Sequence, residues 1–118
     1  MKPSIKIKRA YADVSNDDGY RVLIDRLWPR GVTRKDLQIN QWAKDIAPTS
    51  TLRKWFGHKP ERWKEFQKDY LKELKVNKAA DEFVKSNKAH AVITLIYAAK
   101  DEKHTHALVL QNFLEHKF

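Results

Sequence analysis

The segment from Ala91 to Ala99 constrains the fold more than any other part of the chain, because it is apolar along almost its whole length. It reads Ala-Val-Ile-Thr-Leu-Ile-Tyr-Ala-Ala, with Thr94 as its polar interruption. A strand that lacks alternation of apolar and polar side chains is covered on both faces, as the inner strands of parallel sheets are. The sequence therefore predicts a strand over 90–99 at the centre of a parallel or mixed sheet.

Two further strands are predicted nearer the start of the chain. Residues 5–11 open with alternating isoleucine and lysine, which is typical of an edge strand with one face in water. Residues 20–27 form a second apolar run, and Pro29 ends it because proline has no amide hydrogen to donate to the ladder. The residues between the two runs are rich in Asp, Ser, Asn and Gly, and this composition predicts a surface loop.

Helical signals occupy most of the remaining sequence, and capping residues and apolar side chains three and four apart mark them. The predicted segments are a capped turn at 33–36, a brief helix at 41–46, a helix begun by Ser50 and ended by Gly57, a long helix from Pro60 to about 74, a helix at 78–85 after an Asn77 cap, and a last helix at about 102–115 with Asp101 as its N-cap.

These elements predict an α/β fold with a small, largely parallel sheet of three or four strands and helices packed on its faces. Residues 1–118 are predicted to form a single domain, since a chain of 118 residues supports one core and no second. The right-handed crossover rule places the helices between the second and third predicted strands on one face of the sheet.

The composition excludes several kinds of chemistry. The sequence contains no cysteine, which removes disulfides, thiolate nucleophiles and cysteine-bound zinc. No apolar stretch approaches the roughly 20 residues that span a bilayer, and the first residues lack a hydrophobic secretion signal. We therefore expect a cytoplasmic protein with no membrane partner.

The net charge of +9 raises the attraction of the chain for anions, nucleic acids included. The lysines are nevertheless spread along the predicted helices and do not gather in one run. This distribution favours a generally basic surface over a dedicated nucleic-acid interface.

Charged residues directly follow each of the two apolar strands. If the strands are parallel neighbours, their carboxyl ends meet at one edge of the sheet, where open α/β folds bind ligands. We therefore predict an anion-accepting pocket at this edge. The residues concerned are Asp25, Arg26 and Arg30 after the first strand, and Lys100, Asp101, His104 and His106 after the second.

Most of these residues have a candidate chemical role. Asp25 is the candidate base or orienting carboxylate, and His104 or His106 is the candidate proton-transfer group. The guanidinium groups of Arg26 and Arg30 are suited to gripping phosphate or carboxylate oxygens. The remaining predicted ligand contacts are Lys100, Asp101, Trp28 and Trp55.

A purely structural interpretation of the same residues stays open. Asp25 can form a partly buried ion pair with an arginine that holds the loop, with Trp28 as a packing lid. Asp101 can serve as a helix cap alone. His106 lies four residues before Leu110 and can pack against the core.

No metal and no cofactor is predicted. Asp25, His58, His104 and His106 offer suitable ligand atoms, but two histidines two positions apart on a helix point in different directions. The three glycines of the chain form no phosphate-binding loop after either strand. A Gly-x-Ser-x-Gly nucleophile motif is also missing.

An aromatic cluster offers a further candidate surface. Trp55, Phe56 and His58, with Arg53 and Trp63 nearby in sequence, are residue types on which nucleic-acid bases stack. Aromatic side chains at helical spacing more often belong to a core, and core packing is the favoured interpretation here.

Several blocks of the sequence resemble the YeaO-like family of small bacterial proteins, a domain of unknown function. The resemblance covers nearly the whole chain and implies a compact α/β fold without an established activity. The blocks are residues 21–31, 52–58 and 61–63, and Tyr97-Ala-Ala-Lys-Asp101 with His104 and His106.

The wider superfamily, as the resemblance implies, carries an Asp-Arg-Pro element after one strand and a Cys-His-Arg element at the start of the last helix. Asp25, Arg26 and Pro29 resemble the first element. The second region reads His104-Thr-His106 here. Because the cysteine is missing, thiol chemistry of relatives does not carry over to this chain.

The leading functional prediction is a small cytoplasmic bacterial enzyme or ligand-binding protein with a pocket for a small anionic ligand. One alternative is a basic nucleic-acid-binding accessory module without catalysis, and another is a structural or interaction protein. The sequence leaves open whether the protein is an enzyme, which compound it binds, and its oligomeric state.

Overall fold

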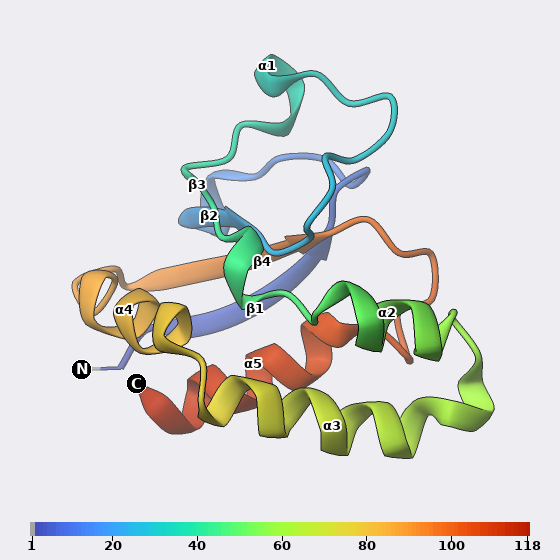
Figure 1. The fold of residues 1–118 in the computed structure, drawn as a ribbon. Coiled ribbons are helices and arrows are strands. Elements are labelled where there is room, and N and C mark those ends of the chain that lie inside the picture. The colour runs from blue at the N-terminus through green and yellow to red at the C-terminus, as the bar shows by residue number, and fades with distance from the viewer. Residues whose placement is uncertain (1) are drawn as a thin grey trace.

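The computed structural model describes residues 2–118, and a four-stranded parallel sheet forms its centre (Figure 1). The strands lie in the order β1-β4-β2-β3, and each neighbouring pair is parallel. The α/β fold with a small parallel sheet that the sequence predicts is confirmed. The strands are β1 (Ser4–Arg9), β2 (Tyr20–Leu23), β3 (Gln41–Trp42) and β4 (Val92–Tyr97).

β4 is the inner strand that its apolar sequence predicts. It pairs with β1 on one side and with β2 on the other. Residues 93–97 are all buried, so both faces of the strand are covered. Thr94 is tolerated there because its hydroxyl donates a hydrogen bond of 2.6 Å to the carbonyl of Asp18.

Four helices cover one face of the sheet and enclose the main core. Figure 1 shows α2, α3 and α5 below the sheet, with α4 at its left end. Fully buried aromatic and aliphatic side chains such as Phe66, Tyr70 and Leu110 join strands and helices in one cluster, and each contributes about 1.5–3 kcal/mol of hydrophobic stabilisation. The helices are α2 (Ser50–Phe56), α3 (Trp63–Lys75), α4 (Lys78–Ser86) and α5 (His106–Lys117).

A short helix and a loop cover the opposite face. The helix α1 (Arg34–Leu37) lies over a small cluster formed by Ala10, Leu23, Leu37 and Ile96. The prediction that all helices between the second and third predicted strands lie on one face is therefore wrong for α1. Its apolar residue Leu37 packs on the face that the four longer helices leave open.

The end of β2 differs from the sequence prediction. The strand was expected over 20–27 but ends at Leu23, and Ile24 makes the last ladder contact with a bond from its amide to the carbonyl of Ile96 at 3.0 Å. The next carbonyl, that of Asp25, instead accepts a hydrogen bond of 2.6 Å from the Trp42 indole. The hydrogen bond from Trp42 thus ends the strand before Pro29 is reached.

Residues 41–46 form an edge strand and a turn where the sequence predicts a brief helix. The amide of Asn40 donates to the carbonyl of Arg21, and that of Ala43 donates to the carbonyl of Leu23, both at 2.8 Å. These bonds hold β3 against β2 and leave only a 3-10 turn after it. The 3-10 turns of the fold are Asn16–Asp18, Lys44–Ile46 and Pro60–Arg62.

Local capping signals are mostly confirmed. Thr33 caps α1, Asn77 caps α4, and Gly57 ends α2 in the left-handed conformation at φ 53°. The predicted cap of α2 is wrong by one position, because the Thr49 hydroxyl, and not that of Ser50, accepts the bond from the helix amide at 3.3 Å.

The last helix starts later than predicted. α5 begins at His106 with Thr105 as its cap, whereas the sequence predicts a start near residue 102 with Asp101 as the cap. The Asp101 carboxylate instead accepts bonds from the amides of Lys103 and His104, at 2.9 and 3.0 Å, and closes a turn before the helix. His104 therefore lies outside the helix and His106 at its first position.

Within residues 2–118, every helix is too short or too polar to cross a membrane. The topology has a direct consequence for function. β2 and β4 are parallel neighbours, so their carboxyl ends lie side by side at one edge of the sheet. This is the arrangement on which the predicted site depends.

Candidate functional site

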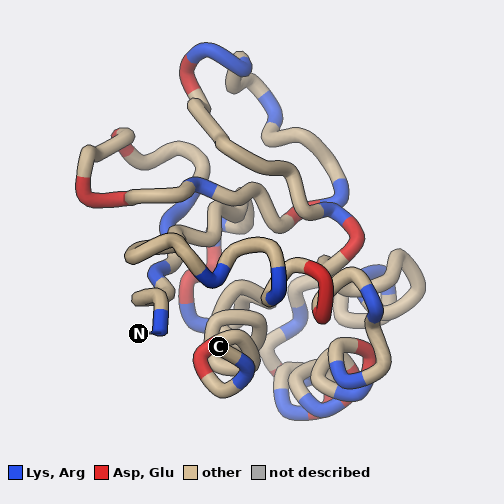
Figure 2. Tube along the Cα trace, turned by 90° about the vertical axis from the view of Figure 1, so that its left-hand side faces the viewer, with Lys and Arg blue, Asp and Glu red and all other residues tan. Residues whose placement is uncertain are grey.

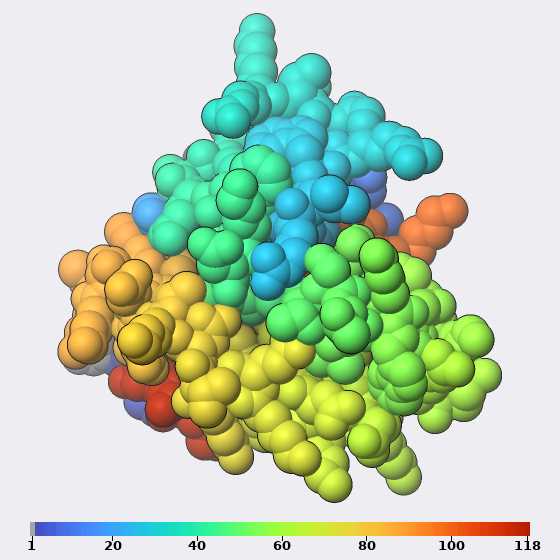
Figure 3. Space-filling model, in the orientation of Figure 1, coloured from blue at the N-terminus to red at the C-terminus, as the bar shows by residue number. Residues whose placement is uncertain are grey.

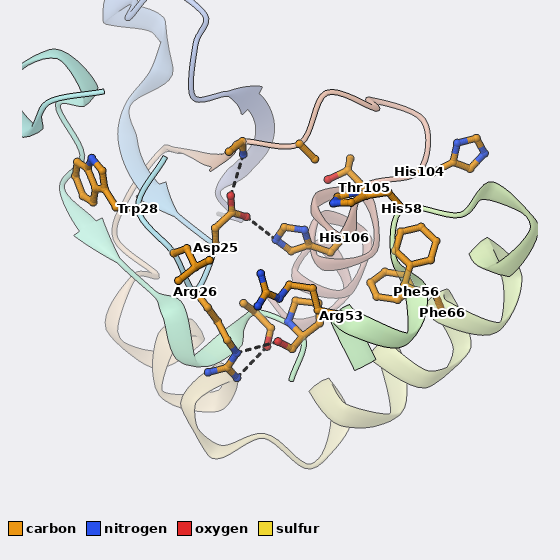
Figure 4. Close-up of a pocket in the computed structure, with 15 residues that line it drawn as sticks. Asp25, Arg26, Trp28, Arg53, Phe56, His58, Phe66, His104, Thr105 and His106 are labelled. Atoms are coloured by element: carbon orange, nitrogen blue, oxygen red, sulfur yellow. Dashed lines mark hydrogen bonds and ion pairs between the residues drawn. The ribbon is translucent and has the colours of Figure 1, made fainter. Parts of the chain in front are cut away.

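A cavity of about 290 Å³ opens at the carboxyl edge of β2 and β4 (Figure 4). Five parts of the chain build it: the residues after β2, the residues after β4, the start of α5, α2 with its flanking loops, and α3, which contributes Phe66. In the space-filling view, the segment after β2 meets α2 at the surface (Figure 3). The lining residues are Asp25, Arg26, Leu27, Trp28, Ala47, Pro48, Arg53, Phe56, His58, Phe66, Ala98, Ala99, His104, Thr105 and His106.

Asp25 joins the ends of the two strands across the cavity wall. One carboxylate oxygen accepts a hydrogen bond of 2.9 Å from the amide of Ala98, just after β4. The other lies 3.1 Å from Nε2 of His106, at the start of α5. The structural alternative of an ion pair between Asp25 and an arginine is therefore wrong, because histidine is the partner.

His106 is held from the same direction by a second oxygen. Its Nε2 lies 3.0 Å from the carbonyl of Ile24, the residue before Asp25. The side chains of His106 and Asp25 are 15% and 18% exposed, so the pair borders the cavity without being sealed inside the protein. Figure 4 shows the histidine ring between Asp25 and the side chains of α2.

Arg26 lies along the cavity wall and is fixed by backbone carbonyls. Its Nε donates to the carbonyl of Pro48 at 2.9 Å, and one Nη donates to that of Ala47 at 3.4 Å. No carboxylate in residues 2–118 forms an ion pair with it. The guanidinium is thus oriented while its positive charge stays uncompensated.

The sequence did not assign Arg53 and His58 to the anion pocket. α2 carries Arg53 to the cavity, where its guanidinium makes no hydrogen bond or ion pair with any other residue of the described chain. His58 lies just after α2 and adopts a left-handed φ of 57° directly after Gly57. A left-handed cap at Gly57 was readable from the sequence, but the packing of α2 against the sheet edge was not.

The two predicted histidines have different surroundings. His104 lines the cavity, but its Nδ1 lies 2.8 Å from the Asp101 carboxylate and its ring meets Trp63 edge-on, with centroids 5.6 Å apart. The hydrogen bond from His104 leads the interactions that lower the pKa of Asp101 below its ordinary value. Of the two histidines, His106 is the one that pairs with Asp25.

Four of the predicted ligand contacts do not line the cavity. The Arg30 side chain is exposed, and its carbonyl accepts a bond from the Tyr11 hydroxyl at 3.0 Å. Trp55 is 39% exposed and stacks with Arg62 at 5.1 Å. The predicted contacts outside the lining are Arg30, Trp55, Lys100 and Asp101.

Tyr70 lies beside His106 and outside the lining of the cavity. Its hydroxyl donates a hydrogen bond of 2.7 Å to the carbonyl of Ile46, and its ring lies 6.2 Å from that of His106. Complete burial raises its pKa well above the ordinary value, and the charges of Glu73 and Asp25 add to this effect. Tyr70 therefore stays neutral and keeps its proton on the bond to Ile46.

The composition of the lining suits an organic anion. Two arginines and three histidines face a single carboxylate, and that carboxylate is already paired with one of the histidines. Phe56, Phe66, Trp28 and Leu27 supply apolar surface beside these groups. Residues 2–118 contain no cluster of three or more His, Cys, Asp or Glu placed to hold a metal ion.

Comparisons with known proteins agree with the sequence resemblance. A family model described as "Inactive DUF488-N3 subclade" matches residues 4–118. The Escherichia coli protein named "Uncharacterized protein YeaO" is 38% identical over 111 residues, which cover 94% of this chain and 96% of that protein. An uncharacterised protein of Mycobacterium tuberculosis is 39% identical over 110 residues, which cover 93% of this chain and 92% of that protein. No solved structure matches the chain significantly.

Proposed function

Because this chain belongs to the inactive DUF488-N3 subclade, a YeaO-like domain, we propose that it binds a small organic anion and carries out no covalent chemistry. The word "inactive" in the family description favours a binding function over a catalytic one. The sequence points the same way, since the chain has no cysteine to act as a nucleophile. The binding site in this proposal is the cavity at the carboxyl edge of β2 and β4.

The uncompensated positive charge of the cavity carries the proposal. Arg26 is oriented by two carbonyls and has no carboxylate partner, and the Arg53 guanidinium has no hydrogen-bond or ion-pair partner among the described residues. Asp25, the one carboxylate of the lining, contacts the Ala98 amide and His106 and forms no ion pair with either arginine. A carboxylate or phosphate in the cavity would supply the missing charge through strong, charge-assisted hydrogen bonds.

The size and the walls of the cavity define the rest of the ligand. A volume of about 290 Å³ lies just below the usual range for ligand pockets, roughly 300–1,000 Å³. The aromatic rings of Phe56 and Trp28 and the exposed side chain of Leu27 give it an apolar side. The ligand in this proposal is a metabolite-sized anion with an apolar part.

The predicted residues take defined roles in this proposal. Arg26 and Arg53 bind the anionic group, and Asp25 orients His106, so it is no longer assigned the role of base. Arg30 and Lys100, which lie outside the lining, contribute long-range attraction. We also retain the cytoplasmic location expected from the sequence as part of the proposal.

Thermal melting with a panel of anions tests this function. Inorganic phosphate, acetate, propionate and 3-phenylpropionate are added at matched ionic strength, with potassium chloride as the reference. Binding of a ligand raises the melting temperature in a concentration-dependent way. Arg53→Gln should weaken binding about tenfold, as expected for loss of a charged hydrogen bond. Lys54→Gln, an exposed neighbour on α2 outside the lining, should leave the binding unchanged.

The same samples separate the alternative functions. Figure 2 shows Lys and Arg distributed over many segments of the chain, which gives nucleic acid no single obvious interface. Steeply salt-dependent binding of generic DNA, with no response to small anions, would favour the nucleic-acid module. The absence of any response to either would favour the structural function and overturn the proposal.

A further inference from the structure

We infer that the ligand is a hydroxy acid or a similar small anion with an O–H or N–H donor, and that Nδ1 of His106 accepts the hydrogen bond from this donor. This inference rests on the proposed anion-binding function and narrows the class of ligand. Its starting point is the position of the proton on the His106 ring.

Two oxygen atoms determine which nitrogen of His106 carries the proton. Nε2 lies 3.0 Å from the carbonyl of Ile24 and 3.1 Å from a carboxylate oxygen of Asp25. A carbonyl has no hydrogen and can only accept, so Nε2 must be the donor. In the neutral imidazole the second nitrogen, Nδ1, then has a free lone pair and is an acceptor.

This tautomer is held in place by the surrounding structure. The second oxygen of Asp25 accepts from the Ala98 amide at 2.9 Å, which fixes the direction of the carboxylate. The Trp42 indole donates to the carbonyl of Asp25 at 2.6 Å and fixes the backbone next to Ile24. Flipping the ring would break both contacts of Nε2 at once. Nε2 therefore keeps its position as the donor, and Nδ1 remains the acceptor.

Nδ1 of His106 is open to a ligand. Within residues 2–118, every buried side-chain nitrogen and oxygen has a hydrogen-bond partner. No partner for this Nδ1 is found in that part of the chain, so the atom must be accessible. Because His106 borders the cavity, the cavity is where a donor can approach it.

Two nearby donors, the Tyr70 hydroxyl and the Arg26 guanidinium, are engaged by carbonyls of the protein, and Arg53 is the residue that binds the anionic group in the proposed function. The Tyr70 hydroxyl donates to the carbonyl of Ile46, and Arg26 donates to the carbonyls of Pro48 and Ala47. The cavity thus presents cationic donors for an anionic group and, in Nδ1 of His106, an acceptor for a hydroxyl or N–H group. A simple carboxylate meets the first requirement only, whereas a hydroxy carboxylate meets both.

Matched pairs of probes test the inference directly. Each pair differs by one hydroxyl: glycolate and acetate, lactate and propionate, and 3-phenyllactate and 3-phenylpropionate, with both enantiomers of the chiral acids. Affinities are measured by calorimetry and thermal melting. In at least one pair the hydroxy acid should bind about tenfold more tightly, the value expected for one hydrogen bond of about 1.4 kcal/mol.

His106→Leu serves as the test variant, because it removes the Nδ1 acceptor, whereas glutamine would keep an acceptor in its amide oxygen. The preference for the hydroxy member of each pair should disappear, and binding of the simple carboxylates should persist. An unchanged preference in the variant would overturn the inference.

Nuclear magnetic resonance gives an independent readout. Two-bond correlations between the ring protons and ring nitrogens report the tautomer of each histidine, and His106 should be protonated on Nε2 in the neutral form. The hydroxy acid should shift the Nδ1 resonance more than its partner acid does. A neutral ring protonated on Nδ1 would overturn the inference without any ligand.

The possible failures are distinguishable. If both members of every pair bind equally and Arg53→Gln weakens them, the inference is wrong and the proposed anion site stands. If no acid of the series binds and phosphate does not bind either, both the inference and the proposed function are wrong.

Discussion

Two aspartates flank the same strand and have opposite surroundings. Asp18 precedes β2, its side chain is 5% exposed, and Lys8 and Arg21 contact its carboxylate at 2.8 and 2.6 Å. Asp25 follows β2, is 18% exposed, and pairs with a histidine at the edge of a cavity. The first carboxylate is enclosed by its ion-pair partners and the second borders a cavity, so the two ends of one strand differ in how far their charged groups are satisfied within the protein.

The closed network at Asp18 leaves little bonding capacity unused. The amide of Ser15 also donates to its carboxylate at 3.0 Å, and Arg21 gives further bonds to the carbonyl of Leu37 at 3.2 and 2.8 Å. Burial alone would raise the pKa of Asp18, but the hydrogen bonds from Lys8, Ser15 and Arg21 outweigh it and lower the pKa. At the cavity, by contrast, the Arg53 guanidinium has no hydrogen-bond or ion-pair partner among the described residues.

The largest expected effect is that of removing the buried carboxylate. Asp18→Ala leaves the guanidinium of Arg21 buried without a counterion, which should cost about 3–5 kcal/mol in the free energy of unfolding. Urea denaturation measures it. Asp17→Ala, at the exposed neighbouring position, is the control and should change stability by less than about 0.5 kcal/mol.

A double variant identifies the cause of that loss. Asp18→Leu combined with Arg21→Met removes both charges, and should be markedly more stable than Asp18→Ala alone, because apolar replacement of a buried pair is often close to neutral. A loss of under about 1 kcal/mol for Asp18→Ala would contradict the proposed difference between the two aspartates.

Part of the Asp18 contribution should depend on pH. Its pKa is lower in the folded protein than its ordinary value of about 3.9, so the ionised carboxylate stabilises the fold above that pH. The contribution is lost as the pH falls through the folded-state pKa. The free energy of unfolding of Asp18→Asn should therefore fall less than that of the wild type between about pH 5 and pH 2. Parallel urea-denaturation profiles across this range would contradict the assignment.

Replacement of the second aspartate should have a smaller effect on stability. Asp25→Ala removes the acceptor of the Ala98 amide and the anchor of His106, and should cost about 1–2 kcal/mol, as loss of ordinary hydrogen bonds does. The preference for hydroxy acids should fall with it, because the His106 ring is no longer oriented. A destabilisation as large as that of Asp18→Ala would show that Asp25, like Asp18, serves mainly to stabilise the fold.

The smallest expected effect on stability is that of the unpaired cavity arginine. Arg53→Gln should change the free energy of unfolding by less than about 0.5 kcal/mol, the range of surface substitutions. Arg21→Gln, at the buried and fully bonded position, should cost several times more. Equal urea midpoints for the two variants would show that the comparison between the networks does not hold.

Much of the fold was predictable because it depends on local sequence. The unbroken apolar run of β4 required cover on both faces, and its central position is confirmed. The caps at Thr33 and Asn77 and the left-handed end of α2 at Gly57 follow from side-chain and backbone preferences of single residues. The predicted end of β2 and the predicted start of α5 were wrong. Hydrogen bonds from Trp42 and from the turn at Asp101 decide where these elements stop and start.

The candidate site was predictable in place and only partly in its members. The sequence pointed to the shared carboxyl edge of two parallel strands, and Asp25, Arg26, Trp28, His104 and His106 do line one cavity there. It did not assign Arg53 or His58 to the anion pocket, because α2 lies far from both strand ends along the chain. No residue spacing in the sequence predicts that α2 lies against this edge of the sheet.

What the sequence by itself determined is therefore the parallel sheet and the edge where polar residues gather. Hydrophobic periodicity and capping act over a few neighbouring residues, so they can be read along the chain. Only the tertiary structure decided that Asp25 pairs with His106, that His104 turns to Asp101, and that Arg53 faces the cavity. These choices depend on how helices pack against the sheet, and packing joins residues that the sequence keeps far apart.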